Sequence, residues 1–190
     1  MSKDRLKSTV NKHAVIICEG ASEQGYVRWL QRLAHRQTIR GVRFNEKNIG
    51  CGDPLAAVTA AVAEIKRLKA DKLNIVWRGV LIDEDSFGKA LEREREARNL
   101  AKTHKIEWLI QPPCHEGFLI KHFEILKTYQ PPTEEICFTH LRKIWPDYKK
   151  GMDALGYEKI LTLEHLRCAR SVWPEFSAML DAIGWTIDLG

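Results

Sequence analysis

The chain has 190 residues, of which 44% are hydrophobic and 29% are charged, and its formal net charge is +5. This composition is ordinary for a globular protein with one full-sized domain. No apolar run approaches the roughly 20 residues of a membrane-spanning helix, and residues 1–7 lack the apolar segment of a signal peptide. The five cysteines include no Cys-x-x-Cys pair, which argues against a disulfide framework and a zinc ribbon. We therefore expect a cytoplasmic protein without a membrane partner.

Apolar runs and helical periodicity predict alternating strands and helices over the first two-thirds of the chain. After a basic N-terminal arm at 1–12, the predicted strands are 13–18, 42–44, 74–82 and 107–110, and the predicted helices are 22–36, 54–68, 86–103 and 115–127. Asp53 and Pro54 mark the start of the second helix as its N-cap and first residue. The alternation predicts an α/β fold, with a mostly parallel sheet of about four strands flanked by helices.

The pattern changes at Gln130-Pro131-Pro132, where the prolines interrupt the chain. Beyond this point, short helices are predicted at 133–144, 162–172 and 174–183. We therefore expect an α/β domain at 13–129 and a helical C-terminal subdomain at 130–190 that packs on the sheet.

Acidic residues stand where three of the predicted strands end. Glu19 follows the first strand, Asp83 and Asp85 follow the third, and Glu116 comes shortly after the fourth. In extended chain, Asp83 and Asp85 share one face while Glu84 points to the other. Ligands of open α/β sheets bind outside the carboxyl ends of the strands, and Mg²⁺ prefers oxygen ligands. The pattern predicts a metal site at this edge of the sheet.

Some of these carboxylates, and Glu23 four residues after Glu19, also have a simpler explanation. Glu23 and Glu116 lie in the first turns of predicted helices, where the helix dipole favours acidic side chains. Asp85 is placed to cap the helix at 86–103. Glu19 is harder to explain, because a carboxylate at the inner end of an apolar strand is costly unless it is paired or bound to a metal.

Three arginines form a basic stripe on the predicted helix 22–36. Arg28, Arg32 and Arg36 recur every four residues, so they share one helix face. Such stripes are typical of surfaces that bind the nucleic-acid backbone. For a single stripe, a solvated helix face is the simpler alternative.

Several short motifs together resemble a known family. They are Cys18-Glu19-Gly20-x-Ser22-Glu23, Gly52-x-Pro54, Asp83-x-Asp85 followed by Gly88, and Pro113-Cys114-x-Glu116 followed by Leu119-Ile120-Lys121-His122-Phe123-Glu124. Over residues 13–127 this set resembles the RloB-like family of Toprim-domain proteins, which is related to OLD-type Toprim nucleases. The first acidic motif and the Asp-x-Asp are common to Toprim branches, and the motif around Glu116 is the most specific to the family.

The resemblance implies a metal-dependent nuclease that hydrolyses phosphodiester bonds of DNA or RNA in a phage-defence or restriction-linked system. It implies that Glu19, Asp83, Asp85 and Glu116 are catalytic. Together with Glu23, these residues would hold one or two Mg²⁺ or Mn²⁺ ions. A single ion with Glu19 as general acid/base and a two-ion arrangement both stay open.

Two other functions also stay open. One is a nucleic-acid-binding or sensor module without its own cleavage activity. The other is a small-molecule phosphatase with Asp83 as nucleophile, although such enzymes usually carry this motif on their first strand. Nucleic acid is the expected partner, and a homo-oligomer is also considered. The chain has no Gly-x-x-x-x-Gly-Lys loop, so ATP hydrolysis would require a separately encoded ATPase partner.

Overall fold

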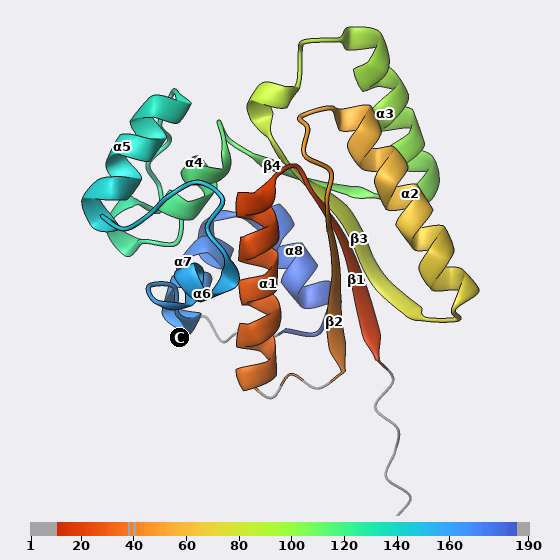
Figure 1. The fold of residues 1–190 in the computed structure, drawn as a ribbon, viewed down its shortest axis with the longest axis horizontal. Coiled ribbons are helices and arrows are strands. Elements are labelled where there is room, and N and C mark those ends of the chain that lie inside the picture. Colours follow the sequence, from red (N-terminus) through yellow and green to blue (C-terminus); the bar gives the residue numbers. More distant parts are fainter. Residues whose placement is uncertain (1–10, 38, 40, 186–190) are drawn as a thin grey trace, which may run out of the picture.

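A single parallel sheet forms the centre of the molecule (Figure 1). The computed structural model describes residues 11–37, 39 and 41–185. The strands are β1 (Lys12–Cys18), β2 (Val42–Asn48), β3 (Asn74–Asp83) and β4 (Glu107–Gln111), and their order in the sheet is β2-β1-β3-β4. All three strand pairs are parallel, which confirms the predicted fold class. The predicted basic arm at 1–12 lies outside the described residues except for its last two, and Lys12 begins β1.

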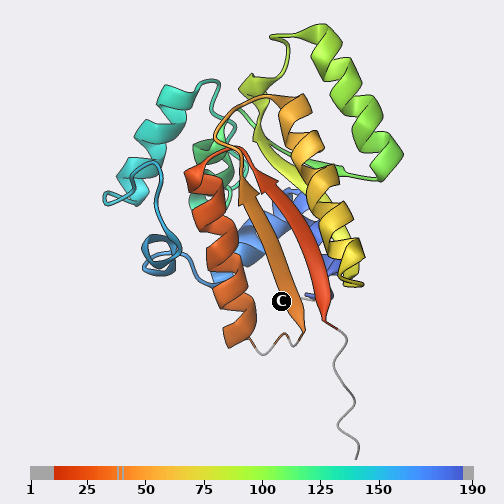
Figure 2. The same cartoon turned by 45° about the vertical axis from the view of Figure 1, so that its right-hand side comes forward.

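Helices cover both faces of the sheet (Figures 1 and 2). One face is covered by α2 (Pro54–Ala70) and α3 (Leu91–His104). The other is covered by α1 (Ala21–Arg36), α4 (His115–Ile120) and α8 (Pro174–Ala182). The same layer also contains α5 (Glu134–Ile144), α6 (Ala154–Glu158) and α7 (Leu163–Val172).

The central strand β1 is apolar along its length because both of its faces are buried. Val15 and Ile17 belong to the core under α2 and α3, whereas Ala14, Ile16 and Cys18 belong to the core under α1. A parallel strand covered on both sides reads as a continuous apolar run rather than as an alternating one.

The start of α2 follows the sequence prediction closely. The side chain of Asp53 accepts a hydrogen bond of 2.9 Å from the backbone N–H of Leu55, and Pro54 is the first helical residue. The cap satisfies a donor that has no partner within the helix. It also fixes the end of the loop that carries Gly52 past the carboxyl end of β1.

The C-terminal helices share one hydrophobic core with α1 and the sheet. Trp145 and Tyr157 from this region are fully buried, in the same cluster as Trp29 of α1 and Ile16 of β1. Each such aromatic side chain removes a large apolar area from water. The domain boundary at residue 130 stays a prediction.

Two predicted boundaries on the first half of the chain differ from the structure. The second strand was predicted over 42–44 and extends to Asn48. β2 is an edge strand, so its polar residues 45–48 are exposed or half-buried and carry no apolar signal. The third helix was predicted from 86 and begins at Leu91, because 84–86 form a 3₁₀ turn and Gly88 adopts a positive φ of 79°.

Further differences follow strand β4. The fourth helix was predicted to reach 127, but α4 ends at Ile120. The next backbone N–H groups bond three residues back, from Lys121 to Phe118 and from His122 to Leu119, and this tighter winding ends the α-helix. A second 3₁₀ turn occupies 124–126. The short helix α6 was not predicted, because its five residues are too few to show a period.

Among the described residues, no helix combines the length and the apolar character needed to cross a membrane.

Gly25 provides a test of how closely α1 packs on the C-terminal region. A Cβ at this position would overlap the backbone carbonyl of Met152, which cannot rotate away as a side chain could. We expect Gly25→Ala to lower the free energy of unfolding by about 1–3 kcal/mol through overpacking, despite the gain in helix propensity. Urea denaturation measures the change.

The control for this variant is Gln24→Ala, one residue earlier on the same helix. Gln24 is only half-buried, so its substitution should change the stability by no more than about 0.5 kcal/mol. A Gly25→Ala protein as stable as the wild type would contradict the close packing of α1 against the segment around Met152.

Candidate acidic active site

The two strongest acidic candidates end neighbouring strands. Glu19 follows β1 directly, and Asp83 is the last residue of β3, which pairs with β1 in the centre of the sheet. The backbone N–H of Asp83 donates a hydrogen bond of 3.0 Å to Glu19 Oε2. The fold therefore brings these two residues together at the carboxyl edge of the sheet.

Glu19 is held in place by donors from two sides. Besides the N–H of Asp83, the Ser86 hydroxyl lies 3.1 Å from both carboxylate oxygens and donates to them. Burial raises the pKa of Glu19, and these hydrogen bonds act against that rise. Glu23 and Asp85 raise it further through their charges. Glu19 is thus a fixed carboxylate rather than a mobile surface group.

Asp83 has a strongly raised pKa. Burial and the nearby carboxylates of Glu23, Glu19, Glu116 and Asp85, in that order of effect, raise its pKa to about 9. Its Oδ1 atom is buried and has no hydrogen-bond partner. A carboxyl group with such a pKa carries a proton at neutral pH, because burial and the neighbouring carboxylates both disfavour its charged form.

Asp85 and Glu84 do not follow the extended geometry expected from the sequence. β3 ends at Asp83, and the chain then turns into the 3₁₀ helix Glu84–Ser86. Asp85 is exposed, yet it lies close enough to raise the pKa of both Asp83 and Glu19. It does not cap α3, whose N-cap residue is Ala90.

Glu23 and Glu116 approach the site from helices on the α1 face. Both are buried, with exposed fractions of 4% and 2%. Glu23 accepts a hydrogen bond of 3.1 Å from the Gly20 N–H, so it does take part in capping α1. Its carboxylate also raises the pKa of Asp83, as does that of Glu116. Glu23 therefore both caps α1 and belongs to the acidic cluster.

The C-terminal region supplies the partner of Glu116. The Tyr148 hydroxyl donates a buried hydrogen bond of 2.9 Å to Glu116 Oε1. Burial raises the pKa of Tyr148, so the phenol keeps its proton and acts as a permanent donor. This contact orients one oxygen of Glu116 and leaves the other for a further partner.

A buried chain of hydrogen bonds holds the segment that carries Glu116. The Gln111 amide donates to His115 Nδ1 at 2.8 Å, His115 Nε2 donates to the Tyr157 hydroxyl at 2.9 Å, and Tyr157 donates to the Ser22 carbonyl at 3.1 Å. Burial lowers the pKa of His115 to about 4, so its ring is neutral at pH 7. Its contact of 3.9 Å with Glu23 is therefore not an ion pair.

Sequence reasoning missed three residues of this arrangement. Ser86 could have been found, because it lies one position after the Asp-x-Asp motif and the turn brings it back to Glu19. Tyr148 and Tyr157 had no detectable signal, since each is defined only by contacts with residues far away in the chain.

Gly52 closes the site from the loop before α2. A Cβ at Gly52 would lie 2.6 Å from Glu19 Oε1 and 2.5 Å from Ser86 Oγ. Only a residue without a side chain leaves both groups in their observed positions. The glycine of the Gly52-x-Pro54 motif thus leaves the space that the Glu19 carboxylate occupies.

The arginine stripe is present on α1 but is not free. Arg28 pairs with Glu46 at 2.9 Å, Arg32 pairs with Glu158 at 2.6 Å, and Arg36 pairs with the same Glu158. The stripe also leads away from the acidic edge, because Arg36 ends α1 roughly 22 Å along the axis from its first residue, at about 1.5 Å per residue. A role in nucleic-acid binding stays a prediction.

Among the described residues, the acidic cluster has the donor chemistry of a metal site but not a complete ligand set. Within residues 11–37, 39 and 41–185, no group of three or more His, Cys, Asp or Glu side chains is arranged to hold one ion. The donor chemistry does fit a hard cation, since every candidate ligand is a carboxylate oxygen. The unpartnered Oδ1 of Asp83 and the mutual repulsion of the cluster also fit, because a cation would relieve both.

These features define an α/β protein with an acidic cluster at the carboxyl edge of a parallel sheet. The chain belongs to the RloB-like family, whose model, described as RloB-like protein, matches residues 14–172. The match extends beyond residue 127, where the resemblance seen in the sequence ended, and includes Tyr148 and Tyr157. No curated protein and no solved structure matches the chain.

The raised pKa of Asp83 predicts the pH dependence of stability in metal-free buffer. The unfolded chain releases this proton near pH 4 and the folded protein near pH 9. The contribution of Asp83 to the free energy of unfolding is therefore fully present below about pH 4 and is lost as the pH rises to 9. Asp83→Asn removes this loss. In EDTA at pH 7, we expect the variant to be more stable than the wild type by about 1–3 kcal/mol, and its advantage should grow from pH 5 to pH 9.

Urea denaturation at pH 5, 7 and 9 measures this effect. Asp147→Asn is the matched control, because Asp147 is exposed and is not one of the carboxylates that raise the pKa of Asp83. Asp83→Asn lowering the stability at pH 7 would instead make Asp83 a structural residue.

Proposed function

We propose that this RloB-like protein is a metal-dependent nuclease that hydrolyses phosphodiester bonds of DNA or RNA. The observation that carries the proposal is the acidic cluster around Asp83, whose pKa is raised to about 9 by burial and by four neighbouring carboxylates. Strongly perturbed titratable groups gathered in one place are typical of functional sites. A purely structural cluster would be expected to pair these charges with cations.

The residues have distinct roles in this proposal. Glu19 and Asp83 would bind Mg²⁺ or Mn²⁺, with Glu23, Asp85 and Glu116 as further ligands for one or two ions. The bound metal would activate water and stabilise the leaving oxygen. On the protein side, Ser86 and the Asp83 N–H orient Glu19, and Tyr148 orients Glu116.

The biological setting is part of the same proposal. Membership of the RloB-like family supports a role in phage defence or restriction, in the cytoplasm and alongside a separately encoded ATPase. The arginine stripe on α1 is a candidate contact for the substrate backbone, although its ion pairs with Glu46 and Glu158 would have to be exchanged for phosphates.

One observation favours the alternative of a binding or sensor module without cleavage activity. The described residues contain no group of three side chains already arranged around an ion. In this alternative the cluster would bind a cation only to shape the surface that nucleic acid contacts.

Cleavage assays with matched variants test the nuclease proposal. We expect the purified protein to cleave single-stranded DNA, double-stranded DNA or RNA with Mg²⁺ or Mn²⁺ and not in EDTA. Glu116→Gln keeps an oxygen that accepts from Tyr148 but removes the charge. It should reduce the rate by about 10²-fold or more, a magnitude typical of a positioned acid or base, without changing the melting temperature.

Glu92→Gln, on the exposed face of α3, is the control with the same change of charge and should keep full activity. Binding of all three substrates without cleavage in either metal would refute the nuclease and support the binding module. If Glu116→Gln keeps its activity, the catalytic set reduces to Glu19, Asp83 and Asp85.

Gly52→Ala tests whether the observed position of the Glu19 carboxylate is needed for activity, without altering any charge. The added methyl group must displace the side chains of Glu19 and Ser86, both of which can rotate. We therefore expect at least a tenfold loss of metal-dependent cleavage with a change in stability of less than about 1 kcal/mol. Cleavage rates and urea denaturation are measured together. Cys51→Ala, in the same loop and exposed, should leave both unchanged, and equal activity of the two variants would remove Glu19 from the site.

A further inference from the structure

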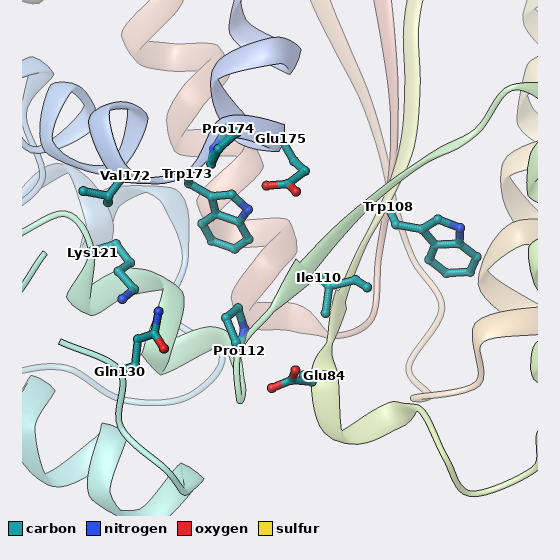
Figure 3. A pocket seen from close by; sticks show the side chains of 10 residues that line it. All are labelled: Glu84, Trp108, Ile110, Pro112, Lys121, Gln130, Val172, Trp173, Pro174 and Glu175. Atoms are coloured by element: carbon teal, nitrogen blue, oxygen red, sulfur yellow. The ribbon is translucent and has the colours of Figure 1, made fainter. Parts of the chain in front are cut away.

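A pocket of about 370 Å³ lies beside the acidic cluster, at the free edge of β4 (Figure 3). Its size falls within the roughly 300–1,000 Å³ of small-molecule sites. Glu84 lines it, and this residue stands between Asp83 and Asp85 in the chain. The turn after β3 therefore faces the acidic cluster on one side and this pocket on the other.

The walls of the pocket are apolar and rigidly supported. They include Ile110, Pro112 and Trp173. The Trp173 ring is fixed by an edge-to-face contact with Phe118, with centroids 4.6 Å apart, and by a tilted contact with Phe176 at 6.4 Å. Flat apolar walls of this kind accept a planar aromatic ligand without rearrangement.

Two carboxylates enter the pocket without partners. Figure 3 shows the Glu175 carboxylate near Trp173 and the Glu84 carboxylate on the other side of Ile110 and Pro112, so the two line the pocket from different sides. Both residues are exposed, and neither carboxylate takes part in a hydrogen bond or ion pair among the described residues. Acceptors without donors select a ligand that presents N–H groups, and their charge excludes a phosphate.

Donors lie on the other side of Pro112. The Lys121 ammonium and the Gln130 amide line the pocket there, close to each other in Figure 3. Lys121 donates one hydrogen bond of 2.7 Å to the Tyr129 carbonyl, which leaves two further N–H groups on its ammonium. The pocket thus offers carboxylate acceptors and a nearby cationic donor against flat apolar walls.

We propose that this pocket binds a guanine base of the nucleic-acid strand next to the cleavage site, an inference that rests on the proposed nuclease function. The Watson–Crick edge of guanine presents two adjacent donors, N1–H and N2–H, followed by the acceptor O6. One carboxylate, that of Glu84 or of Glu175, can accept both donors, and O6 matches Lys121 or Gln130. An unpaired base held against an aromatic side chain and read by polar side chains is the usual mode of single-strand recognition.

The other bases match the pocket less well. Adenine and cytosine each present one exocyclic donor beside ring acceptors that would face a carboxylate. Uracil and thymine present a single donor between two acceptors. Guanine alone can offer a carboxylate two parallel N–H groups, and a bidentate contact of this type discriminates between bases by about tenfold or more.

Binding measured without cleavage tests this inference. Fluorescein-labelled pentanucleotides TTGTT, TTATT, TTCTT and TTTTT, with their RNA equivalents, are titrated in EDTA and followed by anisotropy. We expect the wild type to bind the guanine pentamer about tenfold more tightly than the other three. In the variant Glu84→Gln/Glu175→Gln, the four affinities should lie within about twofold of each other.

The matched control is Glu92→Gln/Glu96→Gln, which makes the same change of net charge on the exposed face of α3. It should keep the tenfold preference, so a general electrostatic effect is separated from a loss of base recognition. Equal binding of the four pentamers by the wild type, a preference for another base, or a guanine preference that survives in the Glu84/Glu175 variant would each overturn the inference. Because EDTA removes any need for cleavage, an inactive protein that still prefers guanine would refute only the nuclease proposal.

Discussion

The crowding of buried carboxylates around Asp83 is the constraint to which the rest of the site responds. Parallel strands deliver their carboxyl ends to one edge, so Glu19 and Asp83 become neighbours as soon as β1 and β3 pair. Burial then raises the pKa of Glu19, Glu23 and Asp83. Two features reduce the cost of this burial. Glu19 accepts hydrogen bonds from the Asp83 N–H and from the Ser86 hydroxyl, and Asp83 keeps a proton.

The surrounding elements keep this cluster in place. Gly52 leaves room for the carboxylate of Glu19, and the neutral His115 links β4 to α6 and α1 through Tyr157. Tyr148 fixes one oxygen of Glu116 from the C-terminal region. The helices beyond residue 130 are therefore part of the architecture of the site, and the family match to residue 172 includes most of them.

The turn after β3 connects the acidic cluster to the pocket at the edge of β4. Because the strand stops at Asp83 and continues as a 3₁₀ turn, Asp83 and Ser86 serve the cluster while Glu84 lines the pocket. One short segment thus links the place proposed for phosphodiester chemistry to the place proposed for base recognition. The arginines of α1 are paired with Glu46 and Glu158, so attraction of the proposed polyanionic substrate would require other basic groups or an exchange of these ion pairs.

The sequence by itself determined the parts that depend on neighbours in the chain. The apolar runs gave the strands, the Asp53-Pro54 cap gave the start of α2, and the strand ends located Glu19 and Asp83, because periodicity and capping act within a few residues. Only the tertiary structure decided the contacts between distant residues. The pairing of Arg32 with Glu158, 126 positions away, and the bond of Tyr148 to Glu116, 32 positions away, have no local signal. Both arise from how the C-terminal helices pack on α1, which is set by the shape of a shared core and not by any pattern within one element.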